Sequence, residues 1–152
     1  MEIVQERLLE ELGILRELTS SDFAALALVN GRTNRIRWLW ASGNENERYK
    51  HMVLRSNQGL AGEVVRLGRP VAADASLPGL ERIRQQYPIM LAENLQAAMA
   101  VPLFKDGAVS GVLMVGSRTA RVFELSDKEQ AASRGEAIAR LIEDFPDIGN
   151  FG

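Results

Sequence analysis

The chain has 152 residues, of which 46% are hydrophobic and 25% are charged, and its net charge is −2 at pH 7. This length fits one domain with a full hydrophobic core over residues 1–152. The charge gives no overall basic field, so nucleic acid is not favoured as a partner. Because the sequence contains no cysteine, disulfides, thiolate nucleophiles, zinc–cysteine sites and thioether-linked chromophores are excluded.

The sequence carries no signal for a membrane or for secretion. Its apolar runs are far shorter than a membrane-spanning helix requires. The first residues, Met1 to Glu6, are acidic, whereas a signal peptide would begin with positive charge. We therefore expect a cytoplasmic protein without membrane contact.

The first predicted element is an amphipathic helix over residues 2–18. Its apolar residues recur at steps of three and four, with Glu and Arg between them: Val4, Leu8, Leu12, Leu15 and Leu18. The polar residues 19–22 end this helix, and Phe23 to Val29 then predict a mostly buried strand.

A turn at Asn30-Gly31 leads to a second strand that contains both tryptophans. Strict alternation places Ile36, Trp38 and Trp40 on one face of this strand. The indoles either pack in the core or face a cavity. The indole nitrogen is only a hydrogen-bond donor, so a buried tryptophan that faces a cavity would suit a ligand made of acceptors.

The stretch from Ser56 to Arg69 places Gly59 and Gly62 where a loop becomes a helix, and Gly68 ends that helix. The first N–H groups of a helix have no internal acceptors, and the helix dipole makes the same end mildly positive. Such a terminus can bind a small anion. The alternative is that Gly59 only permits a tight turn and that Leu60 belongs to the core.

Short elements surround this helix. We expect strands around residues 51–54 and 71–73, and a helical piece over residues 80–86. Pro88 cannot continue that piece, so Ile89-Met90-Leu91 is predicted to be a loop or a short turn. The irregular connection from Leu77 to Glu93 has a length that is more often functional than structural.

The C-terminal part predicts a hairpin followed by a helix. Strands over residues 97–104 and 109–117 flank the turn Lys105-Asp106-Gly107, and the second strand, which is uncharged, is predicted to be central. Ser126-Asp127-Lys128-Glu129 predicts a capping box at the start of the last helix, over about residues 126–145. Helical spacing extends through Ala131, Gly135, Ile138, Ile142 and Phe145, and Pro146 marks the end.

This order of elements predicts an α+β fold. The antiparallel sheet would carry the N- and C-terminal helices on one face and the connections on the other.

The sequence resembles the GAF family of small-molecule sensor domains over nearly its whole length. The resemblance rests on Gly59-Leu60-Ala61-Gly62, Gly68-Arg69-Pro70-Val71, Ala100-Val101-Pro102-Leu103, the Gly107 turn, Gly111-Val112-Leu113 and Phe123. It implies a ligand pocket under the loops and short helices of one sheet face, and terminal helices that pair in a homodimer.

The residue types that the sequence lacks narrow the choice of ligand. GAF proteins that attach bilins or reduce free methionine sulfoxide use a cysteine, which this chain lacks. The chain shows no convincing match to the signature of cyclic-nucleotide-binding members. Haem would have to rest on His51, the only histidine, which in a short polar-flanked strand is more often exposed or structural.

A closer resemblance is to the stand-alone nitrate-receptor GAF proteins of staphylococci and bacilli. It is carried by Trp38 to Asn44, Tyr49-Lys50, Gly59 to Gly62, Arg66 and Gly68-Arg69-Pro70. It implies that nitrate is held by the main-chain N–H groups of Leu60 and Ala61, by the Trp38 indole and by a third main-chain donor at Ile89 or Met90. It implies no cofactor, catalytic residue or metal.

The same resemblance implies a sensor of nitrate that modulates an oxygen-sensing histidine kinase in control of nitrate respiration. Two alternatives stay open, a GAF module for another small ligand and a ligand-free dimerisation module. Enzyme activity is not expected, because the sequence shows no nucleophile elbow, metal cluster or phosphate-binding lysine loop. Arg66 and Arg69 could hold an anion, but charged residues beside a helix end usually lie in solvent.

Overall fold

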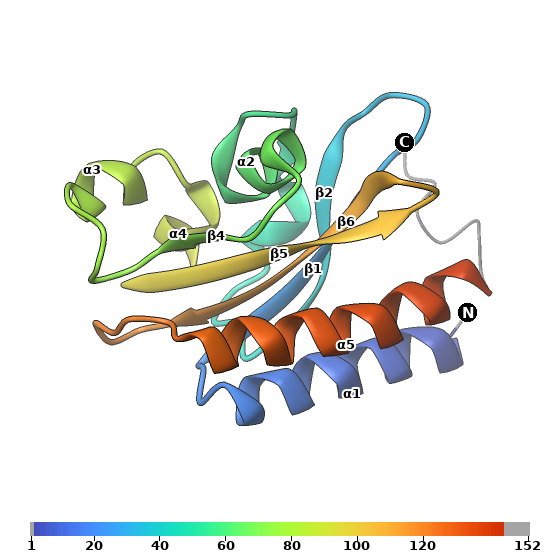
Figure 1. Cartoon of the computed structure of the whole chain (residues 1–152), viewed down its shortest axis with the longest axis horizontal. Helices are drawn as coiled ribbons and strands as arrows, with labels where there is room; N and C mark the ends of the chain where they lie inside the picture. Colours follow the sequence, from blue (N-terminus) through green and yellow to red (C-terminus); the bar gives the residue numbers. More distant parts are fainter. Residues whose placement is uncertain (1, 145–152) are drawn as a thin grey trace.

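A six-stranded antiparallel sheet is the central layer of the computed structural model, which describes residues 2–144 (Figure 1). Its strands follow one another in space in the order β3-β2-β1-β6-β5-β4. They are β1 (Phe23–Val29), β2 (Ile36–Ser42), β3 (Val53–Leu54), β4 (Val71–Ala73), β5 (Ala97–Lys105) and β6 (Ala108–Ser117). The helices are α1 (Glu2–Leu18), the 3-10 helix η1 (Arg48–His51), α2 (Gly59–Leu67), α3 (Leu80–Arg84), α4 (Pro88–Ala92) and α5 (Leu125–Glu143).

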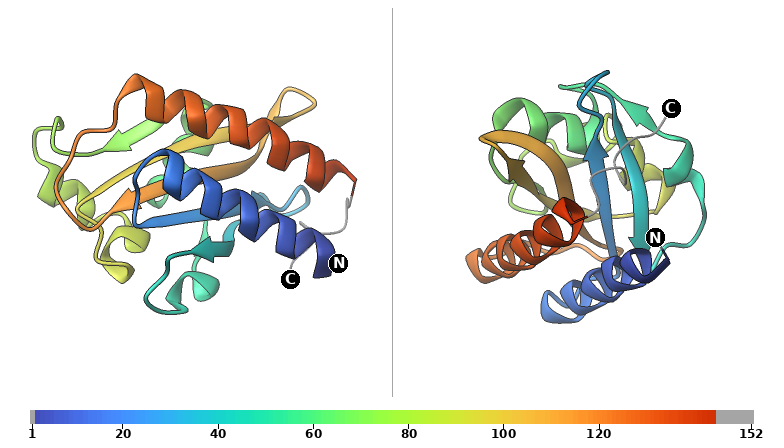
Figure 2. Two further views of the ribbon diagram at one scale, coloured as in Figure 1. Left: turned by 90° about the horizontal axis from the view of Figure 1, so that it is seen from below. Right: turned by 90° about the vertical axis from the view of Figure 1, so that its right-hand side faces the viewer.

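Helices cover both faces of the sheet. The terminal helices α1 and α5 lie side by side on one face, and α2, α3 and α4 lie over the other (Figures 1 and 2). Strand β6 pairs with β1 and with β5, so its predicted central position is confirmed. The predicted α+β arrangement is confirmed as well.

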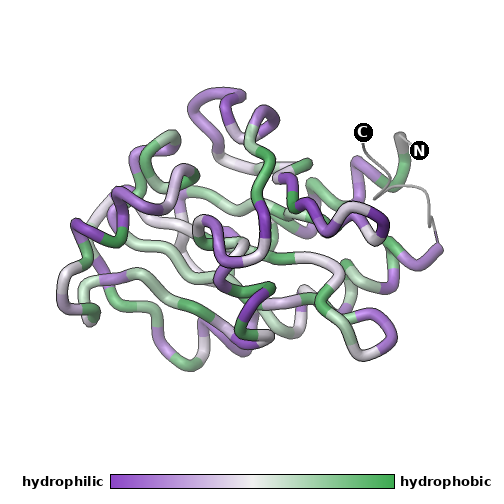
Figure 3. Tube along the Cα trace, turned by 90° about the horizontal axis from the view of Figure 1, so that it is seen from above, coloured by the Kyte–Doolittle hydropathy of each residue, from purple (hydrophilic) through white to green (hydrophobic). Residues whose placement is uncertain are grey.

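The core is therefore divided into two layers by the sheet. In β1, Phe23, Ala25 and Ala27 belong to the layer under α2 and α4, whereas Ala24 and its alternate neighbours belong to the layer under α1 and α5. Hydrophobic stretches of the chain follow the strands, and hydrophilic stretches gather in the connecting loops (Figure 3). Because β1 is buried on both faces, its sequence is almost uniformly apolar.

A β-bulge in β2 separates the two tryptophans. Leu26 of β1 pairs with Trp40, but the next residue, Ala27, pairs with Trp38, so Leu39 is the extra residue. The bulge reverses the alternation of side chains beyond it. Trp38 belongs to the layer under α2 and α4, and Trp40 packs against the layer under α1 and α5. The prediction that one face carries both indoles was wrong.

The hairpin between β5 and β6 is tighter than the predicted three-residue turn. Its loop consists of Asp106 and Gly107, which have φ of +51° and +80°. Two consecutive residues with positive φ are typical of the type I′ turn, whose twist matches that of the flanking strands.

Three other predictions about the elements need correction. Helix α5 begins at Leu125. Its capping box is formed by Glu124 and Asp127, whose carboxylates each accept the other residue's N–H group. The predicted box at residues 126–129 was therefore wrong. His51 ends the 3-10 helix η1 and is not part of a strand. Leu18, at the end of α1, is 46% exposed. The predicted helix residue Phe145 and the helix end at Pro146 lie outside the described residues.

Candidate functional site

The first turn of α2 presents N–H groups without partners. The helix begins at Gly59, and the side chain of its N-cap residue, Gln58, makes no capping hydrogen bond. The Gly62 N–H donates to the Gln58 carbonyl over 3.0 Å. The N–H groups of Leu60 and Ala61 have no acceptor among residues 2–144. These two donors of the turn are therefore free.

Glycine at position 62 permits this geometry. The Asn57 N–H donates to the Gly62 carbonyl over 3.0 Å, so the loop before α2 folds back onto the helix. A Cβ atom at position 62 would lie 2.5 Å from the Arg55 carbonyl oxygen. The loop can therefore approach the helix this closely only beside a glycine.

Helix α4 has one free main-chain donor at its start. Pro88 is its first residue and carries no N–H group. The Met90 N–H donates to the Tyr87 carbonyl over 2.9 Å, whereas the Ile89 N–H has no acceptor in the part of the chain that the structure describes. Of the two main-chain donors predicted here, that of Ile89 is free and that of Met90 is in use. The proline at the first helical position was the signal from which α4, predicted only as a loop or turn, could have been found.

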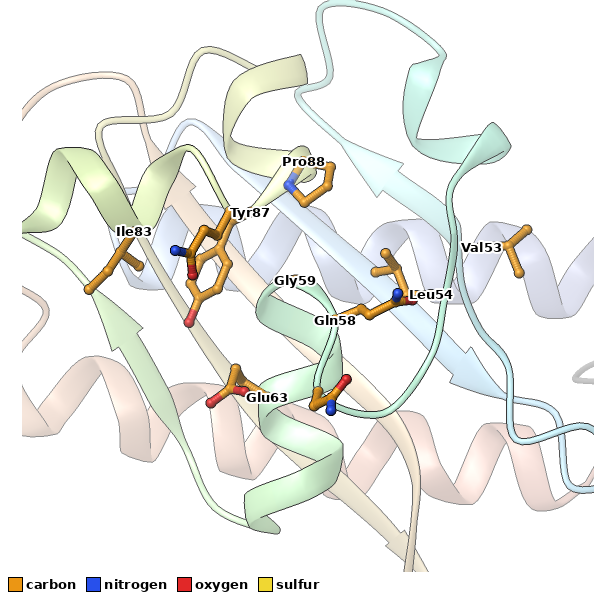
Figure 4. A pocket seen from close by; sticks show the side chains of 10 residues that line it. Val53, Leu54, Gln58, Gly59, Glu63, Ile83, Tyr87 and Pro88 are labelled. Carbon is orange, nitrogen blue, oxygen red and sulfur yellow. The ribbon is translucent and has the colours of Figure 1, made fainter.

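The starts of α2 and α4 meet. A Cβ atom at Gly59 would lie 3.4 Å from Cδ of Pro88 and 3.5 Å from Cδ1 of Leu54 (Figure 4). Gly59 has φ of +66°, a conformation that glycine adopts without strain. The free N–H groups of the two helices therefore belong to neighbouring first turns.

Trp38 carries a third kind of free donor. Its side chain is fully buried, and its Nε1 atom has no hydrogen-bond partner among the described residues. It lies in the same core cluster as Leu60, Ala61, Ile89 and Met90. Leaving a buried donor unsatisfied costs about 1–3 kcal/mol, so such groups usually mark a partner that completes them.

The side chains of the cluster that contains these donors are uncharged. The side chains that share the cluster with Trp38 are apolar apart from the hydroxyl groups of Tyr49 and Tyr87. Burial raises the pKa of both hydroxyls, so both tyrosines are uncharged at neutral pH. Arg66 is exposed and pairs with Glu63 over 2.9 Å, and Arg69 is exposed too.

A surface hollow of about 650 Å³ borders this cluster, and Leu54 and Tyr87 of the cluster belong to its lining (Figure 4). Its lining includes Gly59, Tyr87 and Pro88. None of the five predicted site residues lines it, and none of them is more than 2% exposed. The structure thus places Trp38, Leu60, Ala61, Ile89 and Met90 in one buried cluster.

Other kinds of site have less support. Within residues 2–144, no group of three or more His, Asp or Glu side chains could hold a metal ion. The His51 side chain, named above for haem, is exposed. Across the same residues, every helix is too short or too polar to span a lipid bilayer.

Comparison with known proteins identifies the family. A family model described as "GAF domain" matches residues 1–143. The chain belongs to the GAF domain family. No relative of this GAF domain was found among curated proteins.

Solved structures include relatives of this GAF domain. An NreA protein from Staphylococcus aureus, mutated in its nitrate-binding site, has 36% sequence identity and a TM-score of 0.69, and the match covers 80% of this chain and 91% of that chain. A hypothetical protein from S. aureus has 38% identity and a TM-score of 0.66, covering 77% and 97%. The GAF domain of an Acinetobacter phosphoenolpyruvate-protein phosphotransferase has 18% identity and a TM-score of 0.78, covering 97% and 87%, and shows the fold alone.

Proposed function

We propose that this GAF domain is a nitrate receptor without catalytic activity. The observation that carries the proposal is the fully buried Trp38 Nε1 atom without an acceptor among the described residues. It shares a cluster with the residues that carry the free N–H groups of Leu60, Ala61 and Ile89. Nitrate has three acceptor oxygens and no donor, so a site that offers several N–H groups suits it.

The neutral surroundings favour a singly charged anion. Nitrate carries one charge and is more weakly hydrated than phosphate or sulfate. An apolar site without a buried arginine can take up nitrate, but it cannot offset the larger desolvation cost of a doubly charged anion. In this arrangement Trp38, Leu60, Ala61 and Ile89 donate hydrogen bonds to nitrate, and Met90 supplies apolar wall. Similarity to an NreA protein that has a nitrate-binding site supports this choice of ligand.

The proposed output is a change in the activity of a partner. Nitrate bound between the first turns of α2 and α4 restrains both, and this changes the surface offered to an oxygen-sensing histidine kinase that controls nitrate respiration in the cytoplasm. The kinase must prefer one ligation state, since a ligand with equal affinity for both complexes shifts nothing. Helices α1 and α5 provide the surface for a homodimer.

Thermal unfolding in the presence of anions tests the proposal. A receptor is stabilised in proportion to occupancy, by about 2.7 kcal/mol at a nitrate concentration of one hundred times Kd. Nitrate should raise Tm, while sodium chloride and sodium sulfate at matched ionic strength should not. Equal Tm values in all three salts would contradict the proposal and favour a ligand-free dimerisation module. Stabilisation by a different small molecule would favour a GAF module for another ligand.

A further inference from the structure

Glu93 is a fully buried carboxylate at the C-terminal end of α4. Helix α4 has five residues, and an isolated helix of this length is not stable in water. Its position, and with it the direction of the Ile89 N–H group, must therefore be set by contacts at its ends.

Arg118, which follows β6, holds the end of α4. Its Nη2 atom donates to Oε1 of Glu93 over 2.6 Å, and its Nε atom donates to the main-chain carbonyl of Glu93 over 3.0 Å. Oε1 of Glu93 also accepts the Glu45 N–H over 2.8 Å. Arg118 pairs with the Glu45 carboxylate over 2.6 Å and donates to the Gly43 carbonyl over 3.1 Å. One carboxylate and one guanidinium thus join α4, β6 and the loop after β2.

A second contact strengthens the same junction. The Asn46 side chain donates to the Ala92 carbonyl over 2.7 Å, so the loop after β2 also holds the last residue of α4. The Arg118 N–H donates to Oδ2 of Asp22 over 2.7 Å, at the start of β1. The end of α4 is therefore connected to β1, to β6 and to the loop after β2. Strand β2 carries Trp38.

The pair between Glu93 and Arg118 is not arranged for stability alone. The Glu93 side chain is 0% exposed and that of Arg118 is 21% exposed, so both charges lose much of their hydration. The second carboxylate oxygen of Glu93, Oε2, has no partner among residues 2–144. Buried ion pairs are weak contributors to stability compared with apolar packing, whereas removal of one partner leaves the other charge buried and uncompensated.

We infer that Glu93 and Arg118 are positioning residues for the anion, an inference that rests on the proposed function. They fix the end of α4, and through α4 they fix the Ile89 N–H group relative to Trp38 and to the first turn of α2. An anion with two oxygens can be bound by the remaining donors, on Trp38, Leu60 and Ala61. The third oxygen of nitrate requires Ile89, so this pair sets the preference for nitrate over nitrite.

Titration calorimetry with nitrate and with nitrite tests the inference in Glu93→Gln and Arg118→Lys. In both variants the nitrate Kd should rise by about tenfold, because one hydrogen bond to an anion is weakened, while the nitrite Kd should change by less than about twofold. The affinity ratio between the two anions should therefore fall. An unchanged ratio, whether both affinities drop together or neither drops, would overturn the inference.

Matched control variants separate this effect from a general loss of stability. Glu11 and Arg134 form an ion pair between α1 and α5 over 3.1 Å, on the other face of the sheet. Glu11→Gln and Arg134→Lys should leave the affinity ratio of the wild-type protein unchanged. If the ratio of nitrate to nitrite affinity fell equally in these controls and in the Glu93 and Arg118 variants, the assignment of Glu93 and Arg118 as positioning residues would be overturned.

Amide hydrogen exchange without ligand tests separately whether Glu93 holds the end of α4, whatever the ligand is. In Glu93→Gln, the Glu45 and Met90 amides should exchange at least about fivefold faster than in the wild type, since their local structure opens more often. The Gly62 amide, which donates to Gln58 over 3.0 Å in α2, should keep its wild-type rate. Unchanged exchange at Glu45 and Met90 would overturn the inference, whereas failure of the wild type to bind nitrate would contradict only the proposed function.

Discussion

Gly59, the first residue of α2, lies against Pro88, the first residue of α4, so that a Cβ atom on Gly59 would be 3.4 Å from the proline ring. This contact brings together two helix starts whose free N–H groups belong to residues far apart in the sequence. Glycine is suited to this position because its φ of +66° strains any other residue.

Replacing Gly59 with alanine should therefore affect both stability and binding. We expect Gly59→Ala to lower the free energy of unfolding by about 1 kcal/mol, because the residue must keep a positive φ. It should also weaken nitrate binding, because relief of the strained φ at the first residue of α2 shifts the free N–H groups of Leu60 and Ala61. Gly79→Ala is the control, since Gly79 has φ of +74° but no atom within 4 Å of its Cβ position. It should lose similar stability in urea denaturation and keep the wild-type nitrate Kd; equal loss of affinity in both variants would contradict the account.

The two tryptophans should behave differently. Trp38→Phe removes the free indole N–H and keeps an aromatic ring, so the nitrate Kd should rise by about tenfold. Trp40→Phe should leave Kd unchanged, because the bulge in β2 places Trp40 on the other side of the sheet. Calorimetric titration of both variants checks this. Weakened binding in Trp40→Phe with normal binding in Trp38→Phe would show that the wrong indole had been placed in the site.

The arginines near α2 should not contribute to binding. Arg66 and Arg69 are exposed, and Arg66 pairs with Glu63. We expect Arg66→Gln and Arg69→Gln to keep the nitrate Kd within about twofold, since exposed charges contribute little. A rise of about tenfold in either variant, measured at physiological salt, would mean that a guanidinium holds the anion and that the site is not neutral.

The prediction of the fold from the sequence succeeded where patterns are local. The bounds of α1, β1 and β4 and the central position of β6 follow from apolar spacing, turn residues and the absence of charge. The bulge in β2 could not be predicted, because Leu39, Trp40 and Ala41 are all apolar and fit either face of the strand.

The candidate site was also predicted from the sequence only in part. The pairs Leu60-Ala61 and Ile89-Met90 were predicted as ligand residues by resemblance, and the structure brings them into one cluster with Trp38. No pattern in the sequence indicated the role of Glu93, whose partners Glu45 and Arg118 are 48 and 25 residues away along the chain. Contacts of this kind are set by the tertiary fold and not by local sequence.

Asp74 should make stability depend on pH. It is buried at the end of β4 and accepts hydrogen bonds from Ser76 and from the Phe123 N–H, the latter over 2.9 Å. Burial acts to raise the pKa of this carboxyl, but the hydrogen bonds outweigh it and the pKa lies below its ordinary value. The carboxylate therefore stabilises the folded state above the unfolded-state pKa of about 3.9, and this contribution is lost as the pH falls through the lower folded-state pKa.

Accordingly, Asp74→Asn should lower the free energy of unfolding at neutral pH by about 1–3 kcal/mol, because the amide has only one acceptor oxygen and cannot accept from both Ser76 and the Phe123 N–H. The difference from the wild type should shrink as the pH falls below the unfolded-state pKa of about 3.9 and through the lower folded-state pKa. Asp106→Asn, in the exposed turn between β5 and β6, is the control and should follow the wild type at every pH. Urea denaturation across the pH range checks both; a constant difference for Asp74→Asn would contradict the assignment.

Isothermal titration of the wild-type protein with nitrate, beside chloride, sulfate and phosphate, tests the central claim most directly. The account predicts saturable heat with nitrate at one site per chain, and no specific heat with sulfate or phosphate, whose desolvation a neutral site cannot offset. Absence of heat with nitrate, or binding of sulfate or phosphate as tightly as nitrate, would contradict it.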